Sequence, residues 1–208
     1  MSNTTSPKVI ITGAGPAGAV LAFLLSRAGI STTLIERHKD FSREFRGELL
    51  MPSGLEPLYQ IGLWEDFEKV GQVEIERFRM FINRKPFVTP VMNPEKIARR
   101  SPRWVSQPQL LEMLVNKAAD FPGFSLLRGA RVKNLLFENG HVSGVATDTH
   151  GNLRSDLVVG CDGRTSIVRA KSGIQAQADP LPMDIVWLKL RRQPCIDNKS
   201  LHFYICLL

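Results

Sequence analysis

The sequence has little cysteine, which speaks against a disulfide-stabilised fold. Three cysteines occur in 208 residues, far apart and in no metal-binding spacing: Cys161, Cys195 and Cys206. Paired thiols hold together small secreted domains, whereas reduced cysteines are the default in the cytosol. We therefore expect free thiols, no metal site and a cytoplasmic protein.

A long uninterrupted hydrophobic run is also missing. No stretch reaches the roughly 20 apolar residues that a membrane-spanning helix needs. The first residues do not place a basic segment ahead of an apolar one, as a signal peptide would. We expect neither a transmembrane segment nor a signal peptide.

The excess of basic side chains is modest. Lys and Arg number 27 against 20 Asp and Glu, a formal charge of +7. The only local basic run is residues 96–103, and the other cations are mixed with acids. This distribution speaks against a nucleic-acid partner, and the excess of basic side chains fits an anionic cofactor.

The clearest feature present is a glycine-rich turn, Gly13-Ala14-Gly15-Pro16-Ala17-Gly18, which follows the apolar residues 9–11. Gly13 allows a tight turn, Gly15 lets the backbone approach a diphosphate, and Gly18 lets the next helix pack closely. A helix that begins near Pro16 directs its positive dipole end at phosphate groups. The pattern predicts a dinucleotide site, the alternative being an ordinary glycine-rich turn.

An acidic residue completes the same unit. Glu36 ends the next apolar run, roughly 20 residues beyond the glycines, where dinucleotide-binding folds carry the acid that binds ribose. Its carboxylate can accept hydrogen bonds from both ribose hydroxyls and disfavours a 2′-phosphate. FAD or NAD is therefore expected here rather than NADP.

The rest of the chain mixes helices and strands. Helices are expected at residues 17–28, 52–62, 64–70, 107–119 and 165–171. Strands are expected at 75–82 and 87–89 around a turn, at 183–190, and at 200–208. The pair Asn139-Gly140 favours a hairpin between 132–137 and 141–147, which continues into a third strand at 153–159. Residues 157–160 are expected to form a buried strand beside the glycine-rich unit.

Two further stretches follow the glycine-rich unit: residues 46–54, and residues 156–169 with the pair Asp162-Gly163. Together with residues 13–18 and Glu36-Arg37, they resemble the flavin-dependent monooxygenases of the para-hydroxybenzoate hydroxylase fold. The resemblance implies an α/β, Rossmann-like FAD-binding domain with a three-stranded antiparallel meander and part of a β-rich substrate domain. The implied FAD-binding parts are residues 1–73 and 101–176, and the implied substrate-domain parts are 74–100 and 177–208.

The resemblance also implies roles for individual residues. The ADP half of FAD is assigned to Gly13, Ala14, Gly15, Pro16, Ala17, Gly18 and Glu36. Arg37 is placed beside adenosine, and the backbone of Val132 at adenine. The pyrophosphate is assigned to Arg46, Asp162 and Gly163, and the flavin side to Gln107. Four have plain structural alternatives: a surface arginine for Arg46, a first helical residue for Gln107, a core residue for Val132 and a helix cap for Asp162.

The implied function is NAD(P)H-dependent, FAD-mediated hydroxylation or epoxidation, with O₂, of a small aromatic or apolar molecule. No catalytic side chain is assigned, and the substrate and oligomeric state stay open. Residues 46–54 also resemble squalene epoxidases. The Gly-Asp motif that the family carries later is not found, so we expect an N-terminal portion of a longer enzyme. The alternatives are a flavin-dependent halogenase, a prenyl reductase, or an inactive nucleotide-binding fragment.

Overall fold

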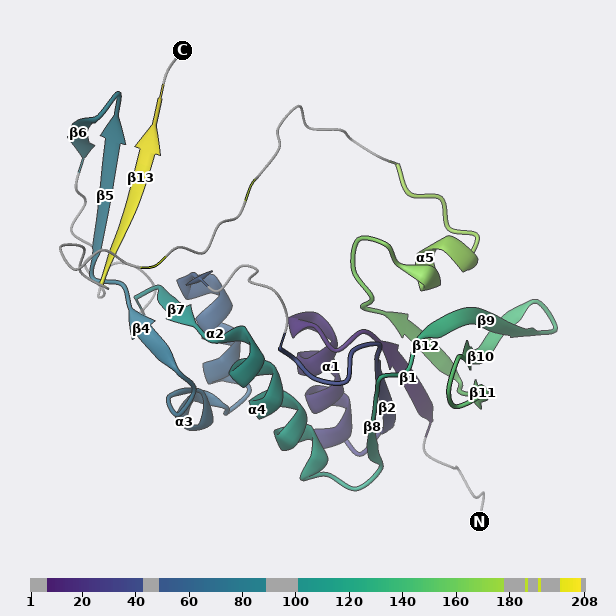
Figure 1. Ribbon diagram of the computed structural model, residues 1–208. Helices are drawn as coiled ribbons and strands as arrows, with labels where there is room; N and C mark the ends of the chain where they lie inside the picture. Colours follow the sequence, from purple (N-terminus) through teal and green to yellow (C-terminus); the bar gives the residue numbers. More distant parts are fainter. Residues whose placement is uncertain are drawn as a thin grey trace. The chain divides into compact units, whose positions relative to one another are not determined.

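The chain forms two compact units, each built from segments that are far apart in the sequence. The computed structural model describes residues 7–42, 49–88, 101–177, 186, 191 and 199–206 (Figure 1). The first unit combines residues 1–43 with 111–184, and the second combines 44–110 with 185–208. The domain boundaries expected from the sequence concern function rather than compactness, and they stay a prediction.

A parallel sheet organises the first unit and confirms the α/β class. Its strands, in the order β12-β1-β2-β8, are β12 (Leu157–Gly160), β1 (Lys8–Thr12), β2 (Ser31–Glu36) and β8 (Phe124–Arg128). Helix α1 (Pro16–Arg27) connects β1 to β2 and packs on the sheet. Because side chains alternate along a strand, Ile10 and Ile35 face one side of the sheet while Ile11 and Leu34 face the other.

A three-stranded antiparallel meander packs on the face that carries Ile10. It consists of β9 (Val132–Glu138), β10 (His141–Thr147) and β11 (Asn152–Arg154). Both turn residues, Asn139 and Gly140, have positive φ, as the predicted hairpin requires. Sheet and meander share one buried cluster, made of Ile10, Ile35, Ala130, Val132, Leu135 and Val145. The expected meander is therefore confirmed.

Three predictions for this unit need correction. The single strand expected at 153–159 is broken at Ser155 and Asp156, where the chain leaves the meander and enters the parallel sheet as β12. Strand β12 is not buried, since it is an edge strand of the described sheet and Leu157 is 54% exposed. Helix α5 (Ile167–Lys171) follows it and begins two residues later than expected.

The second unit contains short helices around a small antiparallel sheet. Its elements are α2 (Pro52–Gln60), α3 (Trp64–Phe67), and strands β3 (Leu49–Leu50), β7 (Arg103–Val105) and β4 (Gln72–Glu74) in the order β3-β7-β4. Helix α4 (Gln107–Ala119) begins in this unit and continues into the first. Its start is fixed by Gly71, whose N–H donates to the Gln109 side chain at 2.7 Å.

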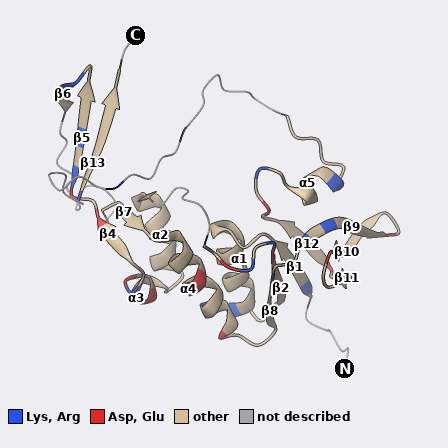
Figure 2. Ribbon diagram, viewed as in Figure 1, with Lys and Arg blue, Asp and Glu red and all other residues tan. Residues whose placement is uncertain are grey.

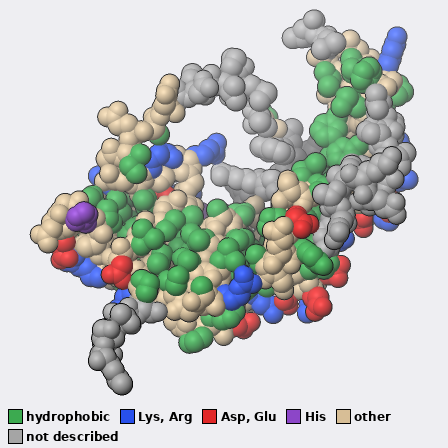
Figure 3. All heavy atoms as spheres, turned by 180° about the vertical axis from the view of Figure 1, so that it is seen from behind, with side chains coloured by type: hydrophobic (Ala, Val, Ile, Leu, Met, Phe, Trp, Pro, Cys, Tyr) green, Lys and Arg blue, Asp and Glu red, His purple; other side chains and the backbone are tan. Residues whose placement is uncertain are grey.

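A second sheet of this unit carries exposed aromatic side chains. Strand β5 (Arg77–Ile82) pairs antiparallel with β6 (Lys85–Val88) and parallel with β13 (Ser200–Ile205). Figure 3 shows hydrophobic side chains gathered on the surface of these strands, and Tyr204 is 64% exposed. The expected strand pair and the expected strand near 200 are confirmed, while most of the strand expected at 183–190 lies outside the described residues.

Charged side chains of both signs are spread over the described helices and strands (Figure 2). Most of the basic run at 96–103 lies outside the described residues, which resume at Ser101. Among the helices that the structure describes, none is long and apolar enough to cross a membrane.

Candidate cofactor-binding site

The turn after β1 packs directly against the loop after β12. Gly13 has φ +92° and donates its N–H to the carbonyl of Ile35 at 2.7 Å. A Cβ at Gly13 would overlap the carbonyl oxygen of Cys161 and lie 2.8 Å from the Cα of Asp162. The N–H of Cys161 in turn donates to the carbonyl of Thr12 at 2.8 Å. Two predicted motifs that lie far apart in the sequence therefore meet at the carboxyl ends of adjacent strands.

The other two glycines of the turn differ in what surrounds them. A Cβ at Gly18 would overlap the carbonyl oxygen of Gly13 and lie 3.2 Å from the Cβ of Cys161, so Gly18 keeps helix α1 close to the turn. A Cβ at Gly15 would meet no atom within 4 Å. Open space therefore lies beside Gly15, where the first-turn N–H groups of a helix have no partner within the helix.

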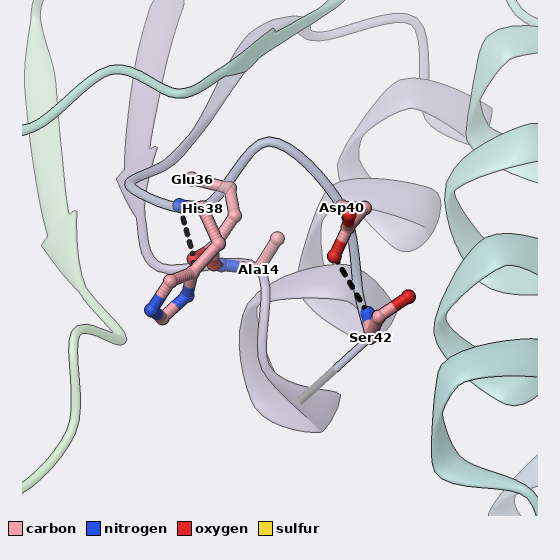
Figure 4. A network of polar contacts seen from close by, with 5 residues as sticks. All are labelled: Ala14, Glu36, His38, Asp40 and Ser42. Atoms are coloured by element: carbon pink, nitrogen blue, oxygen red, sulfur yellow. Dashed lines mark hydrogen bonds and ion pairs between the residues drawn. The ribbon is translucent and has the colours of Figure 1, made fainter. Parts of the chain in front are cut away.

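The carboxylate of Glu36 is buried against the same turn, as Figure 4 shows. The side chain is 3% exposed, and its Oε2 accepts the N–H of Ala14 at 2.9 Å. Its Oε1 accepts the backbone N–H of His38 at 3.0 Å and contacts His38 Nδ1 at 2.8 Å. Ribose hydroxyls would join or displace these partners, so ribose binding by Glu36 stays a prediction.

His38 is a site residue that the sequence motifs do not indicate. It lies two residues beyond the ribose acid, and its side chain is 44% exposed while it contacts the buried Glu36. No spacing rule assigns a function to this position. Only the turn of the chain after β2 brings the imidazole to the carboxylate.

Asp162 uses its two carboxylate oxygens differently. Oδ2 accepts the N–H of Ile167 at 2.7 Å and that of Val168 at 3.3 Å, so the residue helps to cap helix α5, whose N-cap residue is Ser166. Oδ1 is buried and has no hydrogen-bond partner among the described residues. A buried acceptor without a donor is unfavourable and fits a site completed by a ligand. The structural alternative of a helix cap is therefore observed, and one oxygen remains for a further donor.

Cys161 is part of the contact between the two motifs. Burial, together with the negative charge of the neighbouring Asp162, raises the pKa of its thiol. The thiol is free and stays neutral at physiological pH. This thiol therefore acts as a packing group against Gly18.

The remaining predicted residues fall into four groups. The exposed ones are Pro16, Ala17, Arg37 and Gly163. Val132 is buried in the core cluster between the parallel sheet and the meander. Gln107 is the first residue of α4 and belongs to the second unit. Arg46 lies outside the described residues.

The geometry fits a dinucleotide. The open space beside Gly15 at the start of α1 suits a diphosphate, since helix N-termini favour anions. The Glu36 carboxylate lies on one side of the turn, and Asp162 with its unsatisfied oxygen lies in the loop packed against it. The described residues contain no group of three His, Cys, Asp or Glu side chains that could hold a metal ion.

The family model described as "FAD binding domain" matches residues 6–206. The chain belongs to this family. Its fold is that of the flavoprotein monooxygenases related to para-hydroxybenzoate hydroxylase, and its cofactor is FAD.

Two curated relatives illustrate the similarity. The 6-methylpretetramide 4-monooxygenase of Streptomyces rimosus is 34% identical over 190 residues, which cover 88% of this chain and 44% of the relative. Squalene epoxidase 4 of Arabidopsis thaliana is 32% identical over 169 residues, covering 77% of this chain and 32% of the relative. The chain thus spans less than half the length of the relatives that it matches.

Solved structures share the fold. PqsL of P. aeruginosa, in complex with 2-aminobenzoylacetate, has a TM-score of 0.71 and 23% identity, covering 86% of this chain and 49% of that one. The p-nitrophenol 4-monooxygenase PnpA of Pseudomonas putida has a TM-score of 0.69 and 22% identity, with 82% and 44% covered. The Diels-Alderase PyrE3, of pyrroindomycin biosynthesis, has a TM-score of 0.67 and 27% identity, with 82% and 35% covered.

Proposed function

We propose that the chain binds FAD for a flavin-dependent monooxygenase. This enzyme uses NAD(P)H and O₂ to hydroxylate or epoxidise a small aromatic or apolar molecule. The observation that carries the FAD site is the contact between Gly13 and the Cys161-Asp162 backbone, which joins the two motifs. Curated relatives named for 6-methylpretetramide monooxygenation and squalene epoxidation support the reaction class. The two described cysteines, Cys161 and Cys206, are free, which supports the proposal of a cytoplasmic location.

Each part of the site has a defined task in this proposal. Gly13 and Gly18 keep the turn tight, so that the N-terminus of α1 meets the diphosphate beside Gly15. Glu36 accepts a hydrogen bond from the adenosine ribose, and Asp162 Oδ1 accepts one from a cofactor hydroxyl. Bound FAD supplies the redox chemistry, while the protein supplies binding and orientation.

Further residues enter the proposal through the family resemblance. Arg37 flanks adenosine, Arg46 reaches the pyrophosphate, Gln107 contacts the flavin side, and the backbone of Val132 meets adenine. One observation supports the last role, because the N–H of Ala130, two residues before Val132, donates to the carbonyl of Glu36 at 3.0 Å. The start of β9 is thereby tied to the ribose acid.

The direct test is FAD binding by the purified chain, measured by absorbance, mass and titration. Asp162→Asn removes the charge of the acceptor, so we expect about tenfold weaker FAD binding. Asp156→Asn is a matched control, because Asp156 lies at the opposite end of β12 and bonds the N–H of Lys8 at 2.7 Å. Absence of FAD from the purified chain, together with no binding in the titration, would refute the proposal.

The reaction is tested on the full-length protein by NAD(P)H oxidation and O₂ uptake with aromatic and apolar substrates. PyrE3 has the same fold and is named a Diels-Alderase, so redox turnover has to be measured. Product formation without O₂ uptake or NAD(P)H oxidation would place the enzyme in a non-oxidative class. Chloride dependence or reduction of prenyl substrates would instead indicate a halogenase or a reductase.

A further inference from the structure

Arg128 links three elements around the adenosine side of the site. It is the last residue of β8 and is paired in register with Glu36 of β2, so both side chains point to the same face of the sheet. Its guanidinium donates two hydrogen bonds to Glu112 of α4, at 2.8 and 2.6 Å. Such two-point pairing fixes both the position and the plane of the guanidinium.

The same guanidinium lies against the loop that follows Glu36. Its Cζ is 4.5 Å from the ring centroid of Phe41, which is 2% exposed. Two backbone bonds hold the start of this loop: Gly129 donates to the carbonyl of His38 and Ala130 to that of Glu36, both at 3.0 Å. Residues 128–130 therefore hold the loop by its side chains and by its backbone.

The charges around Arg128 also favour a fixed guanidinium beside Glu36. The hydrogen bonds to Glu112 raise the pKa of Arg128, and the charges of Asp40 and Glu36 also raise it, against the effect of burial. Arg128 is therefore a permanent cation near a carboxylate that is 3% exposed. Attraction to a fixed cation restrains that carboxylate.

We propose that Arg128 is a positioning residue for the adenosine ribose: held by Glu112 and Phe41, it keeps the Glu36 carboxylate and the following loop in the geometry that recognises the ribose hydroxyls. No sequence motif assigns a role to this residue. The inference rests on the proposed FAD site and goes beyond it, because it concerns discrimination between riboses rather than cofactor binding alone.

The test measures the affinities of the chain for ADP and for 2′-deoxy-ADP by calorimetry. A hydroxyl bonded to a carboxylate should make ADP the tighter ligand by about tenfold or more. In Arg128→Met we expect this ratio to fall at least threefold, and in Arg128→Lys to fall less, because one cationic contact remains. Arg154→Met is the matched control: it removes the 2.8 Å pair with Glu138 in the meander and should leave the ratio unchanged.

A charge-swapped variant, Arg128→Glu with Glu112→Arg, separates positioning from a structural cross-link. It restores the ion pair and hence thermal stability, but it places a carboxylate beside Glu36, so the ratio should stay low. Recovery of the ratio together with stability would overturn the proposal. If Arg128→Met does not fold, the same two affinities are measured in Glu112→Gln, where we expect a smaller fall in the ratio.

The outcomes distinguish failure of the FAD site from failure of the role of Arg128. If the unmodified chain binds neither FAD nor ADP, the proposed function fails. If it binds ADP but shows no preference over 2′-deoxy-ADP, or if Arg128→Met and Glu112→Gln keep the preference, the FAD site stands and the role of Arg128 is refuted.

Discussion

The parallel sheet of the first unit and the β13-β5-β6 sheet of the second bury their side chains to very different degrees. Ile11 and Leu34 of the parallel sheet are fully buried, because the sheet has α1 on one face and the meander on the other. In the second sheet, Phe203 is 43% and Tyr204 64% exposed. Its aromatic rings instead stack across strands, as Phe81 and Tyr204 do at 4.7 Å.

The difference shows where each unit derives its stability. The first unit is covered on both faces, which is typical of parallel sheets, and it fixes a binding turn at one edge. The second sheet depends on strand pairing and aromatic contacts, and its exposed apolar surface fits a surface for binding another molecule or segment. The proposed diphosphate-binding turn at residues 13–18 thus lies in the unit whose sheet is covered on both faces.

The largest expected effect comes from Gly13→Ala. The positive φ and the overlap with the backbone of Cys161 should cost about 2–5 kcal/mol of stability. FAD binding should be lost with it, as urea unfolding and cofactor titration would show.

Gly15→Ala is the matched control, because its φ is −70° and an added Cβ meets no neighbour. Its free energy of unfolding should change by about 0.5 kcal/mol or less, while FAD binding weakens because the Cβ enters the open space. Unchanged FAD affinity would contradict placement of the diphosphate beside Gly15.

Truncation of buried and exposed strand residues sharpens the comparison between the sheets. Leu34→Ala should cost about 2–5 kcal/mol, because Leu34 is fully buried. Ile205→Ala, at a residue 40% exposed, should cost about 1 kcal/mol. Chemical denaturation monitored by circular dichroism measures both, and equal costs would mean that the second sheet is covered in solution.

A smaller effect is expected from the stacked pair of the second sheet. Phe81 and Tyr204 lie nearly parallel, with 9° between their planes, and such a pair contributes about 0.5–1.5 kcal/mol beyond buried area. A double-mutant cycle with Phe81→Leu and Tyr204→Leu isolates this coupling. A coupling of zero would show that this stacked pair adds nothing to the pairing of β13 with β5.

The smallest effect concerns the reactivity of Cys161. Because its pKa is raised, less thiolate forms at neutral pH, and alkylation by iodoacetamide should be slower than for a cysteine in the unfolded chain. The rate should rise as the pH increases through the raised pKa. FAD should slow the reaction further, and mass spectrometry of the labelled peptide follows both changes.

The local parts of this molecule could be predicted from sequence because neighbouring residues determine them. The turn at 13–18 and the Asn139-Gly140 hairpin require glycine or asparagine at positions with positive φ, which leaves a sequence signature. The family resemblance supplied the Asp162 loop. These features also locate the candidate site.

Other parts could not be predicted because they depend on contacts across the fold. Strand β8 has no strong alternation and forms only beside β2. The exposure of Leu157 follows from its place at the edge of the sheet. The contacts of His38 with Glu36 and of Arg128 with Glu112 join residues that no motif relates.

The parallel pairing of β13 with β5 has a consequence for synthesis of the protein on the ribosome. Ser200 and Arg77 are 123 residues apart, so β5 leaves the ribosome long before its partner exists. At 5–20 residues per second the delay is roughly 6–25 s. Throughout this interval one edge of the nascent β5–β6 hairpin is open, which makes it a natural binding site for chaperones.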